Sequence, residues 1–129
     1  MAIEVYDIFW DDENKWISMD WNGYATSKQF IEGTELLIKL IVQHKASKIL
    51  ADIKDMTLIA QSDQSYIVHS FLPRAIEGGF RAIAVVKPVS YFNAVAIETV
   101  GYRINQTIGQ MRVFENKEDA THWLKTLTF

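Results

Sequence analysis

The sequence contains no cysteine, and among its 129 residues it has only two prolines and six glycines. The missing thiols exclude disulfide bonds, a cysteine nucleophile and cysteine metal ligands. No linker rich in proline or glycine, no internal repeat and no low-complexity segment interrupts the chain. Its 49% hydrophobic and 22% charged residues are typical of a globular domain and argue against intrinsic disorder.

Positive charge and long apolar runs are also scarce. Thirteen Lys and Arg face sixteen Asp and Glu, so the net charge is −3, which favours neither nucleic acid nor anionic membrane binding. The longest strongly apolar stretch, 36–42, is interrupted by Lys39 and is far shorter than the roughly 20 residues of a membrane span. Residues 1–10 carry Glu4 and Asp7 and no basic segment, so we expect no signal peptide and a cytoplasmic location.

Motifs of metal sites and of common enzymes are missing too. The three histidines, His44, His69 and His122, do not pair at the spacing of metal ligands, so we expect neither a metal nor a cofactor. The sequence contains no G-x-S-x-G, Walker or G-x-G-x-x-G motif. Gly78-Gly79 precedes a predicted strand, whereas a phosphate-binding glycine loop follows one, so we interpret this pair as the end of a helix. No set of nucleophile, base and orienting group can be assembled, and we expect no enzymatic activity.

A β-hairpin is predicted at the beginning of the chain. Segments 3–10 and 16–21 are rich in β-branched and aromatic residues and flank a polar turn. Trp16 and Trp21 have opposite parity, so they cannot share one face of a regular strand. We therefore expect one of them on an outer face, where it covers an edge or joins a dimer contact.

Helices and strands alternate after the hairpin. Thr26 and Gln29 form a predicted capping box at the start of a helix, and the apolar runs 48–53 and 81–86 predict buried parallel strands. The remaining elements are a helix capped by Ser62 or Asp63 and interrupted at Pro73, a helix after Ser90, a strand at 111–114 and a helix after Glu115 or Asn116. The order β-β-α-β-α-β-α-β-α predicts one α/β domain over 1–129, in which three βα crossovers follow the hairpin in a single mixed sheet.

Two groups of polar residues are candidates for binding. Asp52 and Asp55 follow the strand at 48–53, and ligands of open α/β sheets favour the carboxyl ends of strands. They could orient a ligand or a basic group of a partner, or they could cap a turn or pair with a lysine. Ser62 and Ser65 open the next helix, where free amides suit an anion, although plain N-capping also explains a serine there.

Five runs in order along the chain resemble a known family. They are 21–23 (WNG), 48–56 (KILADIKDM), 63–79, 80–88 (FRAIAVVKP) and 113–124. Together they resemble bacterial STAS-like domains of the anti-anti-sigma-factor-like superfamily, and more closely the small stand-alone bacterial STAS and lipid-transfer (CRAL-TRIO) relatives. The resemblance covers almost the whole chain and rests on structural runs.

The resemblance implies a role for Ser62. In the superfamily, the strand similar to KILADI leads to a helix whose first turn carries a phosphorylatable serine or threonine, within Asp-Ser-Ser-Gly or Asp-Ser-Thr-Gly. The matching residues here, 60–63, read Ala-Gln-Ser-Asp, which places Ser62 at the phosphoacceptor position. The acid before the serine is absent, and Asp63 replaces the glycine.

The resemblance and the residues together leave two functions open. The first is a non-enzymatic binding or regulatory module that contacts a protein partner or a second copy of itself, as a homodimer. Its predicted binding surface comprises Ser62 with Asp52, Asp55, Ser65 and Tyr66.

The alternative is a carrier or sensor of a small apolar or anionic ligand held between the sheet and the helices. The predicted lining is aromatic and comprises Tyr66, Phe71, Tyr91 and Phe92. A closed core favours the binding module, whereas a cavity of several hundred cubic ångströms favours the carrier.

Overall fold

The computed structural model describes residues 5–129, apart from the side chains of Leu58, Tyr91 and Phe92. Its strands are β1 (Tyr6–Asp11), β2 (Trp16–Trp21), β3 (Gly23–Tyr24), β4 (Lys48–Asp52), β5 (Met56–Leu58), β6 (Ala82–Val86) and β7 (Gln110–Phe114). Its helices are α1 (Ser27–His44), α2 (Gln61–Tyr66), the π-helical segment η1 (Ile67–Phe71), α3 (Leu72–Gly78), α4 (Tyr91–Ile104) and α5 (Lys117–Thr126).

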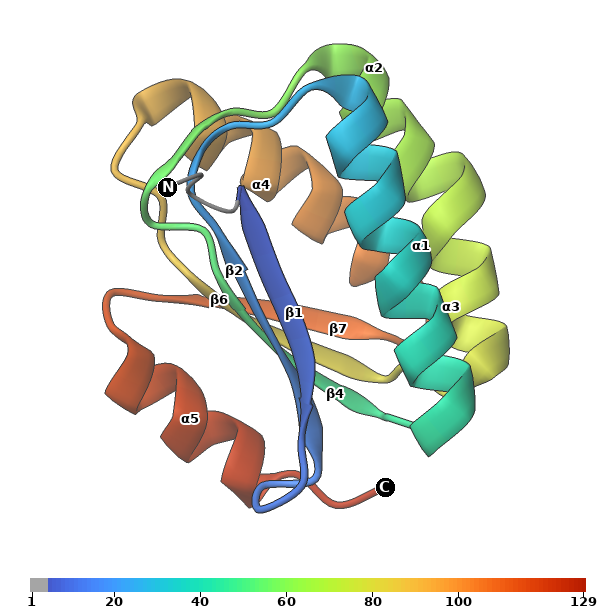
Figure 1. The fold of residues 1–129 in the computed structure, drawn as a ribbon. Coiled ribbons are helices and arrows are strands. Elements are labelled where there is room, and N and C mark those ends of the chain that lie inside the picture. Colours follow the sequence, from blue (N-terminus) through green and yellow to red (C-terminus); the bar gives the residue numbers. More distant parts are fainter. Residues whose placement is uncertain (1–4) are drawn as a thin grey trace.

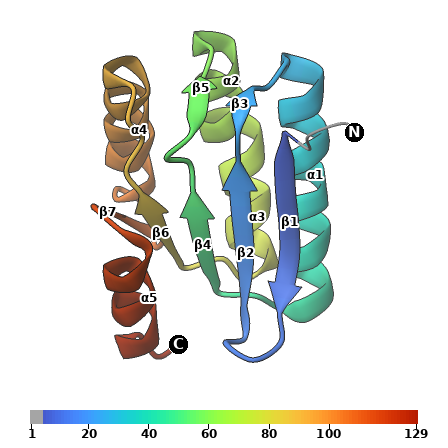
Figure 2. The ribbon, with the colours of Figure 1, turned by 60° about the vertical axis from the view of Figure 1, so that its left-hand side comes forward.

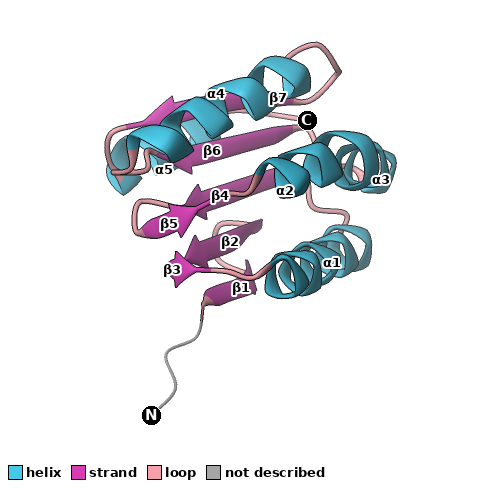
Figure 3. Ribbon diagram, turned by 90° about the horizontal axis from the view of Figure 1, so that it is seen from above, coloured by secondary structure: helices cyan, strands magenta, loops and turns pink. Residues whose placement is uncertain are grey.

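Five strands form one mixed sheet in the order β1-β2-β4-β6-β7 (Figure 3). The hairpin strands β1 and β2 are antiparallel, and β2, β4, β6 and β7 are parallel. This arrangement confirms the predicted α/β fold. A small second sheet that the sequence did not predict pairs β3 with β5 beyond the ends of β2 and β4 (Figure 2).

Helices cover the sheet unequally. Helices α1, α3 and α4 lie on one face, and α5 lies on the other (Figure 1). The larger core cluster includes Trp21 and fills the space on the three-helix side, whereas the smaller cluster joins Trp16 to Leu124 of α5. Trp16 and Trp21 are each only 2% exposed, so the prediction that one lies on an outer face is wrong. The second face of β2 is covered at Trp16, by a helix a hundred residues further along the chain.

Local signals in the sequence explain how the first two helical segments begin and bend. Thr26 and Gln29 form the predicted capping box of α1, which ends with Lys45 in the left-handed conformation. Pro73 has no N–H group, and the helix ahead of it widens into η1, where the Leu72 N–H donates to the Ile67 carbonyl five residues earlier. The expected interruption at Pro73 is therefore a π-helical turn followed by a new α-helical start.

Strand β6 lies in the interior of the sheet between β4 and β7, as its apolar run predicts. Ala84, Val85 and Val86 are buried. A buried strand covered on both faces predicts that Ile83, Ala84, Val85 and Val86 are all buried. Ile83 is only half-buried beside Met111 of the edge strand β7, so this prediction is wrong at Ile83.

Replacement of Val85 by alanine is expected to lower the free energy of unfolding by about 1–3 kcal/mol, because it removes buried methyl groups and leaves a small cavity. Val85 is 1% exposed in the larger core cluster. Urea unfolding monitored by tryptophan fluorescence measures the change. Val42→Ala at a 59% exposed position of α1 is the control and should change stability little. Equal losses for the two variants would contradict the central place of β6.

Candidate functional site

The loops that follow β2, β4 and β6 meet at one end of the sheet (Figure 2). The Gly23 N–H donates to the Asp55 carbonyl at 2.9 Å, and the Val89 N–H donates to the Lys54 carbonyl at 3.2 Å. Gly23 has a φ of +69°, which glycine adopts without strain at the turn between β2 and β3. Backbone hydrogen bonds therefore join the three loops into one continuous structure.

Asn93 of α4 fixes the segment that leads from β5 into α2. Its side chain is fully buried, its Oδ1 accepts from the Ile59 N–H at 2.8 Å, and its Nδ2 donates to the Met56 carbonyl at 2.8 Å. Gln64 Nε2 adds a hydrogen bond to the Ile59 carbonyl at 3.2 Å. Asn93 was not predicted from the sequence, where its only signal is one amide between aromatic and apolar residues at the start of a helix.

Ser62 is the second residue of α2 and is exposed. Ala60 occupies the N-cap position without a side-chain hydrogen bond, and its carbonyl accepts from the N–H groups of Asp63 and Gln64. The prediction that Ser62 or Asp63 caps this helix is therefore wrong, because the helix begins one residue before Ser62. Asp63 is 5% exposed, so most of its side chain is turned away from the solvent that Ser62 faces.

Replacement of Ser62 by alanine is expected to change the free energy of unfolding by less than about 0.5 kcal/mol, since no cap is lost and alanine favours helix. Thr26→Ala, which removes the capping-box hydroxyl of α1, should lower it by about 1 kcal/mol. Thermal melts of the two variants make the comparison. A loss at Ser62 equal to the loss at Thr26 would mean that Ser62 is a cap after all.

Four side chains define what we call the loop surface. Tyr24 is 61% exposed and Val89 is 82% exposed, and Asp55 and Ser62 are also exposed. They lie at the same end of the sheet, and exposed aromatic and aliphatic side chains beside polar ones occur in protein contact regions.

The strand order has no reversal beneath the loop surface. Small ligands of open α/β sheets bind where the strand order reverses, because the loops on either side then diverge. Here the crossovers from β2 to β4, β6 and β7 all advance in one direction. Their helices α1, α3 and α4 stay on the same face (Figure 1). This end of the sheet therefore lacks the reversal of strand order at which small ligands usually bind.

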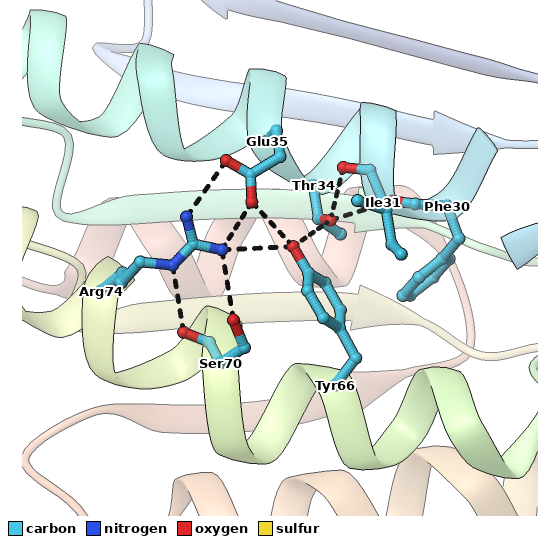
Figure 4. A network of polar contacts seen from close by, with 7 residues as sticks. All are labelled: Phe30, Ile31, Thr34, Glu35, Tyr66, Ser70 and Arg74. Atoms are coloured by element: carbon cyan, nitrogen blue, oxygen red, sulfur yellow. Dashed lines mark hydrogen bonds and ion pairs between the residues drawn. The ribbon is translucent and has the colours of Figure 1, made fainter. Parts of the chain in front are cut away.

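Tyr66 points to a different neighbour, helix α1 (Figure 4). Its hydroxyl donates to Glu35 Oε1 at 2.9 Å and also lies 3.2 Å from Thr34 Oγ1. Arg74 of α3 donates to both carboxylate oxygens of Glu35, at 3.1 and 2.6 Å, and through Nε to the Ser70 carbonyl at 3.2 Å. These bonds tie α1 to α2, η1 and α3.

The network has an electrostatic consequence. Hydrogen bonds from Arg74 and Tyr66 lower the pKa of the Glu35 carboxyl, and Glu35 in turn raises the pKa of Arg74. Both side chains are 40–47% exposed, so solvent screens the pair. The arrangement serves helix packing, and the Tyr66 hydroxyl is already engaged in it.

An apolar cavity of about 80 Å³ lies between the sheet and the helices. Phe71 lines it, as do Trp21 and Phe30, and Thr34 is its one polar side chain. Ligand sites for drug-sized molecules usually measure about 300–1,000 Å³. The side chains of Tyr91 and Phe92, which were predicted to line a ligand site, lie outside the described part of the chain. The core is therefore closer to the closed form that favours a binding module.

Ser65 lies apart from the loop surface, in a surface hollow between α2 and α4. It shares this hollow with His69, Glu98 and Arg103. The predicted binding residues are thus distributed: Asp55 and Ser62 lie at the loop end of the sheet, Ser65 faces α4, and Tyr66 faces α1.

Asp52 belongs to a third location, on the sheet face that carries α5. It ends β4, where its Oδ1 accepts from the Lys54 N–H at 3.1 Å. The strand register places Asp52 opposite Asp20 and Asp20 opposite Asp7, so three carboxylates lie in one row across β4, β2 and β1. Burial raises the pKa of Asp20; Asp52 and Asp7 raise it further, while Lys117 and Lys54 oppose the rise.

Replacement of Asp20 by asparagine is expected to stabilise the protein at neutral pH by about 0.5–1 kcal/mol, because two like-charge contacts across the strands disappear. The raised pKa means that the folded state takes up a proton before the unfolded state as the pH falls. The ionised Asp20 therefore lowers the free energy of unfolding fully at neutral pH. This loss of stability shrinks as the pH falls toward 3.8, the ordinary pKa of an aspartate.

Thermal melts at neutral pH and near pH 4 test this dependence, with Asp55→Asn at an exposed position as the matched control. A gain from Asp20→Asn that is the same at both pH values would contradict it.

Within residues 5–129, no three His, Asp or Glu side chains are placed to hold a metal ion. No helix in this range is both long enough and apolar enough to cross a bilayer.

Comparison with known proteins supports the observed fold. The profile of the family described as SpoIIAA-like matches residues 16–125. A crystal structure of an uncharacterised protein of the DUF3478 family from Shewanella loihica PV-4, described as having a SpoIIAA-like fold, superposes with a TM-score of 0.59. The two chains are 19% identical, over 96% of this chain and 98% of the other. No curated protein matches the chain.

Proposed function

Because the chain belongs to the SpoIIAA-like family, we propose that it is a non-enzymatic binding module that acts through protein contacts at the loop surface. The SpoIIAA-like fold is compatible with a regulatory module of this kind. The observation that carries the proposal is the combination of exposed Tyr24 and Val89 with a rigidly supported loop. Asn93 holds that loop through two buried hydrogen bonds.

A protein partner suits this surface better than a small molecule does. The loops after β2 and β6 expose Tyr24 and Val89, and the strand order has no reversal where a small ligand would bind. Contact regions between proteins commonly centre on such aromatic and aliphatic residues. Rigid backbone support lowers the entropy lost on association, because the loops need no ordering when the partner binds.

Ser62 is the proposed centre of regulation within the loop surface. Its exposed hydroxyl has no capping role, so a modification there need not disturb the helix. A phosphate at this position would lie near the positive end of the α2 dipole and would add a charge to the contact region. Asp63 is buried next to it, which leaves the hydroxyl as the exposed group of this pair.

The test compares proteins captured from host lysate by wild-type protein, Ser62→Asp and Tyr24→Ala. Gln106→Glu is the matched control, because it adds one negative charge at an exposed position after α4, near the opposite end of the sheet. We expect the same partner with wild type and Gln106→Glu, and at least tenfold less of it with Tyr24→Ala and with Ser62→Asp. Identical capture by all four proteins would contradict the proposal.

A carrier or sensor of a small apolar or anionic ligand is the second candidate. The apolar lining of the cavity between the sheet and the helices favours an apolar ligand, although the volume of about 80 Å³ favours the binding module. Native mass spectrometry of protein purified from its own host detects such a ligand and reports the oligomeric state in the same spectrum. A homogeneous mass equal to that of the chain alone, or of two chains, would contradict the carrier.

Homodimerisation is a further part of the proposal, and light scattering at micromolar concentration tests it. The sequence favoured a dimer because it predicted an exposed tryptophan on the hairpin. This argument is weakened, because Trp16 and Trp21 are buried and Trp10 stacks on His44 with ring centroids 4.3 Å apart. Phe9, at 44% exposure, is the hairpin aromatic that stays available. A monomer at these concentrations would contradict the dimer.

A further inference from the structure

The second face of the sheet is covered over only part of its width. Helix α5 packs against β4, β6 and β7, and Trp16 of β2 reaches into the cluster beneath it. Within residues 5–129, no helix covers β1 on this face (Figure 2). Phe9 is on this face of β1, opposite Ser18, and is 44% exposed.

The row of carboxylates lies on the same face. Asp7, Asp20 and Asp52 stand directly opposite one another on β1, β2 and β4. Asp7 is exposed, and Asp20 and Asp52 are half-buried. Among the described residues, none of the three has a Lys, Arg or His nitrogen within 4.0 Å, since the three ion pairs found there involve other acids. Like charges placed directly opposite on neighbouring strands oppose folding.

We propose that this part of the sheet, comprising Asp7, Phe9, Asp20 and Asp52, is an interaction surface for a basic amphipathic helix of a partner protein. The partner's helix would lie across the strands beside α5 and supply the cover that β1 lacks. Its Lys or Arg side chains would pair with the acidic row, and an apolar side chain would rest on Phe9.

The spacing of the row matches a helix. Neighbouring strands are about 4.8 Å apart, so three carboxylates on adjacent strands span roughly 10 Å. Residues i and i+7 of an α-helix are separated by about 10.5 Å along the axis, with i+3 or i+4 between them on the same side. Three basic residues on one face of a helix can therefore each meet one carboxylate.

The negative charge of the acidic row decides which kind of partner can bind this surface. A nucleic acid or an anionic membrane would be repelled by the row. Metal binding is not supported, since no group of three ligands within the described chain is placed to hold an ion. Lys54 and Lys117 lower the pKa of Asp20, but among the described residues neither nitrogen lies within 4.0 Å of its carboxylate, so no direct ion pair neutralises the row.

The test uses a defined probe, a fluorescein-labelled 18-residue helical peptide with lysines along one face and leucines beside them. A second peptide carries glutamate in place of each lysine. Fluorescence anisotropy measures Kd for wild-type protein, for the triple variant D7N/D20N/D52N and for the control E32Q/E77Q/E98Q. The control also removes three negative charges, but from exposed positions on α1, α3 and α4, on the other side of the molecule.

We expect the lysine peptide to bind wild type and the control with Kd values within twofold of each other. The triple variant should raise Kd at least tenfold, and the glutamate peptide should not bind. Phe9→Ala should raise Kd at least threefold at unchanged net charge. Equal weakening in the triple variant and the control would show attraction to net charge only and overturn the proposal. Failure of wild type to bind the lysine peptide would also overturn it.

These residues do not overlap the loop surface, so the outcome is independent of the proposed binding role of that surface; Phe9 alone is shared with the proposed dimer contact. The triple variant is also expected to stay folded, because asparagine at Asp20 relieves like-charge repulsion and asparagine at Asp52 can still accept from the Lys54 N–H. A melting temperature at or above that of wild type confirms that a loss of binding is not a loss of structure.

Discussion

Replacement of Asn93 by alanine is expected to lower the free energy of unfolding by about 3–5 kcal/mol. The change removes the partners of the Ile59 N–H and the Met56 carbonyl, and each buried group left without a hydrogen bond costs about 1–3 kcal/mol. Ile59 and Met56 are themselves buried, so water cannot replace the amide without opening the loop. The cavity left by the side chain adds to the loss.

Asn105 provides a control with the same chemistry. Its Oδ1 accepts from the Met111 N–H at 2.9 Å and its Nδ2 donates to the Met111 carbonyl at 3.4 Å, but it is exposed at the end of α4. Because water can replace these bonds, Asn105→Ala should lower stability by about 1 kcal/mol or less. Urea unfolding compares the two variants, and hydrogen exchange at the Ile59 amide reports on the loop. Equal losses would show that Asn93 does not support the loop as inferred.

Replacement of Gly33 by valine is expected to destabilise the protein by about 3 kcal/mol or more, although glycine is itself a poor helix former. A Cβ atom at Gly33 would lie 2.6 Å from Cη2 and 2.8 Å from Cζ2 of Trp21, and 3.3 Å from Cδ1 of Tyr6. The Trp21 ring is buried and packs against Phe30, so it cannot move aside without disturbing the core. Helix α1 depends on this glycine to approach the hairpin closely.

Glu32→Val on the exposed side of α1 is the control, because it introduces the same β-branched side chain without the clash. Thermal and urea unfolding of both variants separate helix propensity from overpacking. If Gly33→Val unfolds within about 1 kcal/mol of Glu32→Val, the close approach of α1 to Trp21 is not a constraint.

Strands buried on both faces were predictable because they need continuous apolar runs. The segments 48–53 and 81–86 show this and became β4 and β6. The β3–β5 pair was not predictable, since strands of two and three residues show no periodicity. The prediction that either Trp16 or Trp21 lies on an outer face failed because the cover of Trp16, α5, comes from the far end of the chain, and neighbouring residues do not reveal it.

The residues of the candidate site were also predictable only in part. Ser62 was found through the resemblance to STAS-like domains. Its position within the helix depends on which residue starts α2, and a sequence pattern does not locate a helix end to within one residue. Asn93 could not be recognised, because its two hydrogen-bond partners lie 34 and 37 residues away. The row formed by Asp7, Asp20 and Asp52 exists only through strand register, which no single segment specifies.

Site-specific photo-crosslinking in host cells tests the binding role of the loop surface most directly. Benzoylphenylalanine is introduced in place of Tyr24, in place of Val89, and, as the control, in place of Val42 on the exposed side of α1. The proposed function predicts that Tyr24 and Val89 crosslink to one and the same protein, that Ser62→Asp reduces this product, and that Val42 does not form it. Absence of a shared product from Tyr24 and Val89, or an equal product from Val42, would contradict a binding module that acts through the loop surface.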